Sequence, residues 1–198
     1  MRALRTMALS LAAAVSLGAQ GKVFLTTSEA LQLAFPKCEI QRTQRVLTAA
    51  MKAQVKRLAG HKPRRSLVVG YEARRAGKLV GTAYFDRHRV RSRSQLLMVA
   101  VDPQGKVLRV EVLAFHEPTE YLPHGRFFAQ FAGRALDRRL RTGRAVRGVA
   151  GATLTVDATV AAVRRVLATH RVLTARAEHA EHADRADQAG SKVSDSRS

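Results

Sequence analysis

The chain has 198 residues, with 35 Lys or Arg against 15 Asp or Glu and a formal net charge of +20 at pH 7. This length fits one domain with terminal extensions, and a hydrophobic content of 46% excludes a wholly disordered basic chain. The single cysteine, Cys38, excludes an intramolecular disulfide and any metal or iron–sulfur site built from several cysteines. The charge indicates an acidic partner, which could be a lipid surface, a nucleic acid, a protein or a phosphorylated ligand.

The two ends of the chain are predicted to be extensions of a central domain. Residues 1–19 combine two early arginines with an apolar run and a small-residue end, which predicts a secretory signal peptide, either cleaved or retained as an anchor. Residues 174–198 place alanine at every third position from 177 to 189 among charged and polar residues, which predicts a disordered or frayed helical tail. The domain, residues 20–173, then holds nearly all of the charge excess, and we expect the protein to be exported to the periplasm or the extracellular face of the membrane.

Two short helices are predicted near the start of the domain. Thr26 and Glu29 have the spacing of a capping box, and the apolar residues after them form a helix that ends at Pro36. Thr48 caps a second helix, which stops at Gly60.

Two hairpins are predicted next in the chain. The first spans residues 67–90 with its turn at 76–78, and the second joins runs 96–101 and 107–115 through an Asp-Pro-Gln-Gly turn at 102–105. Adjacent hairpins predict an antiparallel sheet. Together with the flanking helices, this sheet makes the expected fold class α+β, in a single domain.

The last part of the domain is predicted to be mostly helical. A short amphipathic stretch at 126–136 contributes Phe127, Phe128 and Phe131 to the expected core. A helix is expected from about residue 155 to about 173, with a stripe of valines and leucines buried and its arginines, including Arg164 and Arg165, outside.

The segment directly before this last helix is the best candidate binding site. Residues 148–155 read Gly-Val-Ala-Gly-Ala-Thr-Leu-Thr, so glycines lie next to a helix start and two threonines. Glycine allows close approach of a ligand, and a helix start supplies unpaired N–H groups and the positive end of the helix dipole. The pattern predicts a phosphate or carboxylate site at 151–155. An ordinary turn capped by Thr155 is the alternative.

This segment also carries a resemblance to a known family. Gly151-Ala152-Thr153-Leu154-Thr155, followed by an Ala/Val-rich helix, resembles the Ser-Gly-Ala-Thr-x-Thr signature of the FMN-binding domain family. That family includes flavin-carrying subunits of the sodium-pumping quinone reductase and of the Rnf complex, and small exported FMN-binding proteins. The preceding turn at 102–105 and the His-Glu-Pro-Thr loop at 116–119 follow the family's order, so the resemblance covers about residues 23–173.

The resemblance implies that FMN is the cofactor and that its phosphate lies at the start of the last helix. In the family, the threonine that corresponds to Thr153 can be esterified to the FMN phosphate by a flavin transferase that consumes FAD with Mg²⁺. The transferase's preferred target is Asp-x-x-[Ser/Thr]-Gly-Ala-Thr, and this chain has Arg147 and Ala150 at the first two defined positions. Attachment can therefore be covalent or non-covalent, and in a non-covalent site Arg147 could pair with the phosphate.

Four further residues are candidates for the flavin pocket. His116 and Glu117 belong to the loop at 116–121, which is otherwise a solvated loop. His88 and Arg91 belong to a segment that in the small family members also carries His and Arg.

An alternation of arginines runs through the same segment. Arginine occupies positions 87, 89, 91 and 93, so on a strand all four side chains share one face. Such a face repels itself without nearby anions, which predicts a flavin phosphate, an anionic lipid or a nucleic acid as counterpart, the alternative being a hydrated, salt-screened surface.

These observations predict an exported FMN-binding electron-transfer protein. No set of nucleophile, base and acid is evident, so we expect a flavin carrier and assign no catalytic side chains or metal ligands. The expected partners are a redox protein, a flavin transferase and an anionic membrane surface. The alternative is a basic module that binds membranes or polyanions without flavin. Nucleic acid is disfavoured because the chain has no Trp, few aromatic residues and no recognised nucleic-acid-binding motif.

Overall fold

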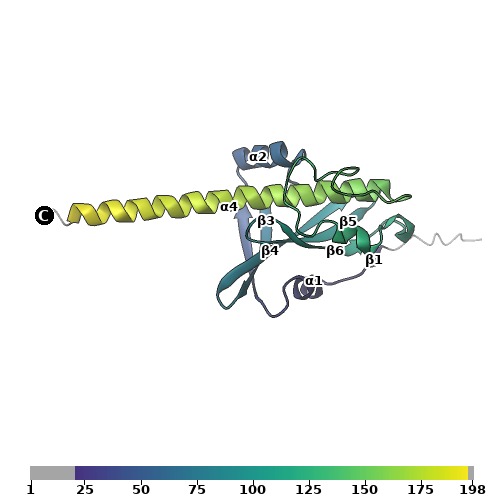
Figure 1. Cartoon of the computed structure of the whole chain (residues 1–198), viewed down its shortest axis with the longest axis horizontal. Coiled ribbons are helices and arrows are strands. Elements are labelled where there is room, and N and C mark those ends of the chain that lie inside the picture. The colour runs from purple at the N-terminus through teal and green to yellow at the C-terminus, as the bar shows by residue number, and fades with distance from the viewer. Residues whose placement is uncertain (1–20, 196–198) are drawn as a thin grey trace, which may run out of the picture.

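The computed structural model describes residues 21–195 and shows a six-stranded antiparallel sheet with helices on both faces (Figure 1). The strand order is β1-β6-β5-β4-β3-β2. The strands are β1 (Lys22–Val23), β2 (Glu39–Val46), β3 (Leu67–Arg75), β4 (Lys78–Arg89), β5 (Ser94–Val101) and β6 (Val107–Phe115). The expected α+β fold of a single domain is confirmed. The predicted signal peptide, residues 1–19, lies outside the described residues.

The two predicted capped helices are present. The helices are α1 (Thr27–Ala34), α2 (Ala49–Ala59), α3 (Gly125–Ala129) and α4 (Thr153–Asp195), with a 3₁₀ turn, η1, at Thr119–Tyr121. Thr26 and Glu29 form the full capping box of α1, and the Thr48 side chain accepts a hydrogen bond from the N–H of Met51 at the start of α2. Gly60 ends α2 in the left-handed conformation, with φ of 83°. Among residues 21–195, no helix combines the length and apolar character that crossing a membrane requires.

The sheet separates two hydrophobic cores. On one face, α2, α3 and α4 cover the larger core, whose fully buried members include Leu47, Phe131 and Leu140. On the other face, α1 covers a smaller core that contains Met98 and Phe35. Figure 1 shows α2 and α4 on the side of the sheet opposite to α1. The first part of α4 is therefore held against the sheet along its length.

Both predicted hairpins are present, but the edge strand β2 was not predicted. Its sequence, EIQRTQRV, has no apolar face, and most of its residues are exposed. It pairs in full register with β3, from Glu39 opposite Arg74 to Val46 opposite Leu67. Main-chain pairing with the partly buried strand β3 therefore holds β2 in the sheet, and the sequence of β2 shows no alternation of apolar and polar residues that would predict a strand.

The expected face of four arginines is wrong. β4 ends at Arg89 and β5 begins at Ser94, so Arg91 and Arg93 lie in the turn between the two strands. This turn is closed by a hydrogen bond from the N–H of Val90 to the carbonyl of Arg93, at 3.0 Å. The alternation of arginine with other residues continues through the turn between β4 and β5. An alternation of period two does not by itself show where a strand ends.

The last helix is longer at both ends than predicted. It begins at Thr153, inside the glycine–threonine segment, and continues to Asp195. Residues 174–195, predicted as a disordered or frayed helical tail, continue the helix away from the domain (Figure 1). Alanine, arginine, glutamate and glutamine favour helix, so the composition that gives this stretch no apolar face still supports helical backbone.

The expectation that Arg164 and Arg165 lie outside is also wrong. Both are buried, with exposed fractions of 7% and 6%. Arg164 donates hydrogen bonds to the carbonyls at the end of α2, those of Leu58 and Ala59, and to those of Asp137 and Leu140. This guanidinium therefore satisfies the free carbonyls at the end of one helix and ties them to α4.

Replacing Arg164 by methionine should lower the free energy of unfolding by about 2–3 kcal/mol, because the carbonyls lose charged donors while the stem volume stays. Urea denaturation of the variant measures the loss. Arg171→Met, on the exposed side of the same helix, is the matched control and should change stability by less than about 0.5 kcal/mol. Equal stability of the Arg164 and Arg171 variants would contradict the cross-linking role.

Candidate functional site

The segment predicted to bind phosphate forms a tight turn that leads into α4. The N–H of Ala152 donates to the carbonyl of Val149 at 3.1 Å, and Gly151 adopts a φ of 79°. A side chain at Gly151 would meet no atom within 4 Å, so the glycine is required for its backbone conformation and not for lack of space. Ala152 is buried, and Thr153 and Leu154 are exposed. The turn therefore presents the first residue of the helix to solvent.

Polar groups without partners gather at this helix start. The N–H of Val156 donates to the carbonyl of Ala152 at 2.9 Å, and the three N–H groups before it, from Thr153 to Thr155, have no acceptor among residues 21–195. The Thr155 hydroxyl is buried, and its Oγ1 also lacks a hydrogen-bond partner within the described residues. A buried hydroxyl without a partner costs stability, and a phosphate oxygen could accept a hydrogen bond from it. The residues fit a phosphate group.

The approach to this turn is fixed by a side-chain amide. The N–H of Arg147 donates to Gln130 Oε1 at 2.8 Å, and Gln130 Nε2 donates to the carbonyl of Arg147 at 3.4 Å. Gln130 thus binds the backbone of Arg147 from both sides while the arginine side chain stays exposed. Arg147 precedes the helix start by six positions and adds a positive charge to this end of the molecule.

Glu117 holds the turn between β4 and β5. Its Oε1 accepts hydrogen bonds from the N–H groups of Arg91, Ser92 and Arg93, at 3.1, 2.7 and 2.7 Å. Burial would raise the pKa of Glu117, but these backbone donors and the Ser92 hydroxyl hold it below its ordinary value. This carboxylate therefore already has a structural role, which is to join the loop at 116–121 to the hairpin turn.

The same loop forms one wall of a cavity of about 410 Å³. Arg91 stacks over Tyr121, with its guanidinium carbon 5.2 Å from the ring centroid. The cavity is lined by Arg91, Ser92, Arg93, Glu117, Pro118 and Tyr121. His116 lies at its side, where its Nδ1 donates to the carbonyl of Ser94 at 3.0 Å and its ring lies against Gly21. Arg91 and Glu117 therefore line one cavity with His116 next to Glu117 in the chain, and the role of all three in a flavin pocket stays a prediction.

His88 is placed differently, in the interior. Its exposed fraction is 3%. Its Nδ1 lies 3.0 Å from Asp86 Oδ1, and its Nε2 lies 3.1 Å from Gln95 Oε1. Gln95 in turn accepts a long hydrogen bond, 3.5 Å, from the Thr159 hydroxyl of α4. His88 thus belongs to a buried polar network under α4 and is not among the residues that line the cavity beside the 116–121 loop.

The network continues into a buried ion pair. Arg165 donates to Asp86 through Nε at 2.9 Å and through Nη2 at 2.7 Å. Burial would raise the pKa of Asp86, but hydrogen bonds from His88 and Arg165, and their charges, hold it below its ordinary value. Asp86 is therefore an ionised carboxylate in the interior, with both oxygens occupied.

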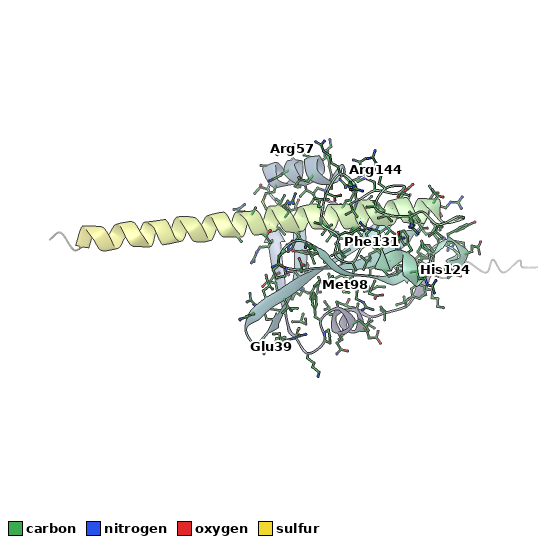
Figure 2. All side chains as sticks on the ribbon, in the orientation of Figure 1. Glu39, Arg57, Met98, His124, Phe131 and Arg144 are labelled. Carbon is green, nitrogen blue, oxygen red and sulfur yellow. The ribbon has the colours of Figure 1, made fainter. Side chains whose placement is uncertain are left out.

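These contacts show how α4 runs across the sheet. Thr159 lies near Gln95, Arg165 near Asp86, and further along α4 the Tyr84 hydroxyl lies 3.0 Å from His170 Nδ1. The N-terminal end of α4 therefore lies nearest the turn at residues 90–93, and its later residues lie progressively farther from that turn. The helix start, the 90–93 turn and the 116–121 loop consequently belong to one end of the molecule. In Figure 2, His124, which follows this loop, lies toward the end at which α4 begins.

Sequence reasoning missed the members of the buried network. Asp86, Gln95 and Arg165 come from two strands and a helix, and up to 79 positions separate hydrogen-bonded partners. One signal was available, since a carboxylate follows an apolar run in a predicted strand and must then find a partner. Gln130, which fixes Arg147, carried no signal at all.

Comparison with known proteins assigns this region. Residues 96–168 match the family model of the FMN-binding domain. The chain matches none of the curated proteins with which it was compared. The matched segment runs from β5 into α4 and includes the 116–121 loop and Gly151–Thr155, whereas His88 and Arg91 precede it. Residues 96–168 are therefore similar to the FMN-binding domain, and FMN is the cofactor that this match indicates.

Proposed function

We propose that the protein is an exported FMN-binding electron-transfer protein in which the start of α4 holds the FMN phosphate. The observation that carries this proposal is the buried Thr155 hydroxyl, which has no partner among the described residues and lies beside three unpaired N–H groups within the matched segment. A phosphate would accept from these donors and would lie at the positive end of the helix dipole. Bound FMN supplies one- and two-electron redox chemistry.

The residues around this end would hold and orient the flavin. Arg147 would add a charged donor to the phosphate, and Gly151 and Ala152 would let the backbone approach it. The cavity beside the 116–121 loop would take the more distant part of the cofactor, with Arg91 and Tyr121 offering flat surfaces. Leu154, which is 52% exposed, would cover part of the ligand.

Thr153 is the proposed point of covalent attachment. It is exposed at the first position of α4, where an external transferase could reach it. In the proposed step, Thr153 Oγ1 loses its proton and forms a phosphoester bond with the FMN phosphate of FAD. The FAD pyrophosphate bond breaks, and AMP leaves.

Flavin content tests the proposal as a whole. The full chain is produced with its leader in a bacterial host, with and without a flavin transferase, and purified in the presence of FMN. We expect a yellow protein that contains about one flavin per chain. A colourless protein that contains no flavin after denaturation in either host would overturn it.

Intact mass tests the attachment point. Wild type produced with the transferase should gain the mass of FMN less one water, and Thr153→Ala should gain none. Thr153→Ser keeps a hydroxyl and is the matched control, so it should keep the adduct. An adduct of unchanged mass in the alanine variant would exclude Thr153, and the absence of any adduct in wild type would leave a non-covalent site.

Export and electron exchange complete the proposed function. The proposal of export rests on the basic start, apolar run and small-residue end of residues 1–19. Fractionation of the producing cells tests it, since the flavin protein should appear outside the cytoplasm. Electron exchange is tested by assaying reduction of the bound flavin with candidate redox proteins.

A second function, binding to an anionic surface, is supported by one feature of the structure. Exposed basic side chains gather on α2 and on the loop between residues 137 and 147, and Figure 2 shows Arg57 and Arg144 on the same side of α4. Its members are Lys56, Arg57, Arg138, Arg139, Arg141 and Arg144, and none forms an ion pair within residues 21–195. Burial and the charges of three nearby arginines lower the pKa of His61 in this region, as expected for a positive local potential.

We propose that this basic surface docks flavin-loaded protein on an anionic membrane or an acidic redox partner. Vesicles of phosphatidylglycerol should bind it in low salt and release it in high salt, and uncharged phosphatidylcholine vesicles should not bind it.

A further inference from the structure

A cavity among the described residues lies away from the proposed phosphate site and opens where the sheet splits. The ladder between β3 and β4 ends at the pair Gly70 and Tyr84. Beyond this point, residues 67–69 of β3 pair only with β2, and residues 85–89 of β4 pair only with β5. A cavity of about 670 Å³ occupies the fork between them. A volume of this order is typical of small-molecule sites.

The lining of this cavity is strongly basic. It includes five arginines and a single carboxylate, that of Asp86. Both oxygens of Asp86 are already bound by Arg165, and Oδ1 also by His88. The arginines on the exposed rim are Arg42, Arg64, Arg65 and Arg87. Positive charge around a cavity with low-dielectric walls focuses the potential inside it and attracts anions.

One nitrogen of a mostly buried arginine is also left without a partner here. Arg165 lines the cavity, and its side chain is 7% exposed. Its Nε and Nη2 bind Asp86, whereas its Nη1 has no acceptor among residues 21–195. A guanidinium held in place by one carboxylate and left with a free nitrogen can donate to a second anion without moving.

The walls between these charges are apolar. Tyr71 and Phe85 pack edge to face, with ring centroids 5.3 Å apart, and both line the cavity. Leu96 and Val166 add aliphatic surface from β5 and α4. A ligand that suits this lining has an aromatic body, which packs on the rings, and an acidic group, which reaches the arginines.

The cavity is separate from the proposed flavin phosphate site. Arg165 follows Thr153 by 12 positions on α4, a distance of about 18 Å along the helix axis. The contact of Thr159 with Gln95 fills the interval between helix and sheet. None of the residues that we assign to the flavin lines this cavity.

We propose that the fork between β3 and β4 is a second binding site, which takes a small aromatic anion. It goes beyond FMN binding, because a second molecule can occupy the fork while FMN occupies the other end. The acidic group of this ligand lies among the rim arginines and Arg165, and its ring lies against Tyr71 and Phe85.

The test compares two probes that share one ring system. Naphthalene-2-sulfonate and uncharged 2-naphthalenemethanol are titrated into the full chain, with and without bound FMN, and amide resonances are followed by NMR. The sulfonate should shift the amides of residues 67–69 and 85–87 saturably, with an affinity at least about tenfold above that of the alcohol. Equal affinities, or shifts confined to other residues, would overturn the proposal.

Paired variants separate the fork from general charge attraction. Arg64→Gln with Arg65→Gln removes two rim charges and should weaken sulfonate binding about tenfold. The matched control, Arg138→Gln with Arg139→Gln, removes the same charge from the loop between residues 137 and 147. It should change the affinity for the sulfonate by less than about twofold. Equal loss in both pairs would overturn the site.

Flavin content, measured by absorbance in the same samples, separates this inference from the proposed function. Sulfonate binding without any flavin binding would refute only the flavin proposal. Sulfonate binding that bound FMN abolishes would show that the fork belongs to the flavin, and would overturn a second site.

Discussion

Replacing Asp86 by asparagine should lower the free energy of unfolding by about 3–5 kcal/mol at pH 7. The substitution keeps the shape of the side chain and removes its charge, so the Arg165 guanidinium stays buried without a counter-charge. It also replaces one of the two carboxylate oxygens, which together accept from Arg165 and His88, by an NH2 group that can only donate. Urea denaturation followed by circular dichroism measures the loss.

The loss of unfolding free energy in Asp86→Asn should depend on pH, and the pKa of Asp86 determines whether the loss grows or shrinks as the pH falls. Because the folded protein holds this pKa below its ordinary value, the ionised carboxylate stabilises the fold above the unfolded pKa of about 4. That stabilisation disappears as the pH falls through the lower folded value. The difference between wild type and Asp86→Asn should therefore be full at pH 7 and small at about pH 2.

Two further variants make the result specific to the buried pair. Arg165→Met should destabilise by a similar amount, and the double variant should lose clearly less than the sum, because neither charge is then left alone. Glu72→Gln breaks a partly exposed ion pair with Arg74, two positions along the same strand β3, and should cost at most about 1 kcal/mol. Additive losses at Asp86 and Arg165 would show that the two side chains stabilise the fold independently.

The parts of the fold that the sequence predicted are those whose signal is local. The capping box at Thr26, the cap at Thr48 and the left-handed Gly60 each depend on residues within a few positions. The turn at residues 102–105 is equally local, since Asp102 accepts from the N–H of Lys106 within the turn. The residues within a few positions of each cap or turn are enough to determine its backbone conformation.

The parts that were not predicted depend on partners far along the chain. β2 is a strand because β3 lies beside it, and its own residues show no buried face. Arg164 and Arg165 do not belong to the apolar stripe of α4, yet both are buried. Arg164 donates to carbonyls of α2, and Arg165 donates to the carboxylate of Asp86. Burial of a charge is decided by the partner, and a single sequence does not say where the partner lies.

In the candidate site too, the features that could be predicted are local in the sequence, and those that could not depend on distant residues. The glycine–threonine segment is contiguous, so its turn and helix start could be predicted, and the structure adds the left-handed φ of Gly151 and the unpartnered Thr155 hydroxyl. Glu117 was predicted as a pocket residue from its place in a loop. The structure shows that its carboxylate is occupied by backbone donors of the 90–93 turn, a contact between segments 24–26 positions apart.

Replacing Thr155 by valine should move stability and flavin affinity in opposite directions. In flavin-free protein, the methyl group removes a buried hydroxyl that has no partner within the described residues, so the free energy of unfolding should rise by about 1–3 kcal/mol. Valine and threonine have the same shape and similar helix propensity, so little else changes. The affinity for FMN should fall about ten- to a hundredfold, because a hydrogen bond to a charged phosphate is lost.

The measurement uses protein produced without a flavin transferase, so that binding is reversible, and combines FMN titration with urea denaturation. Thr155→Ser keeps the hydroxyl and should bind FMN close to wild type. Thr159→Val, one helical turn further along α4, is the matched control. It removes a hydroxyl that does donate to Gln95, so it should lower stability by about 1 kcal/mol and leave FMN affinity unchanged.

The two responses together distinguish a binding group from a packing group. A Thr155 hydroxyl kept for the phosphate stabilises only the flavin-bound protein, whereas one that serves the fold would stabilise the flavin-free protein. Loss of stability in Thr155→Val with unchanged FMN affinity would therefore remove this hydroxyl from the site and leave Thr153, Arg147 and the backbone N–H groups to hold the phosphate. A gain in stability with a loss of affinity would place the phosphate at the start of α4.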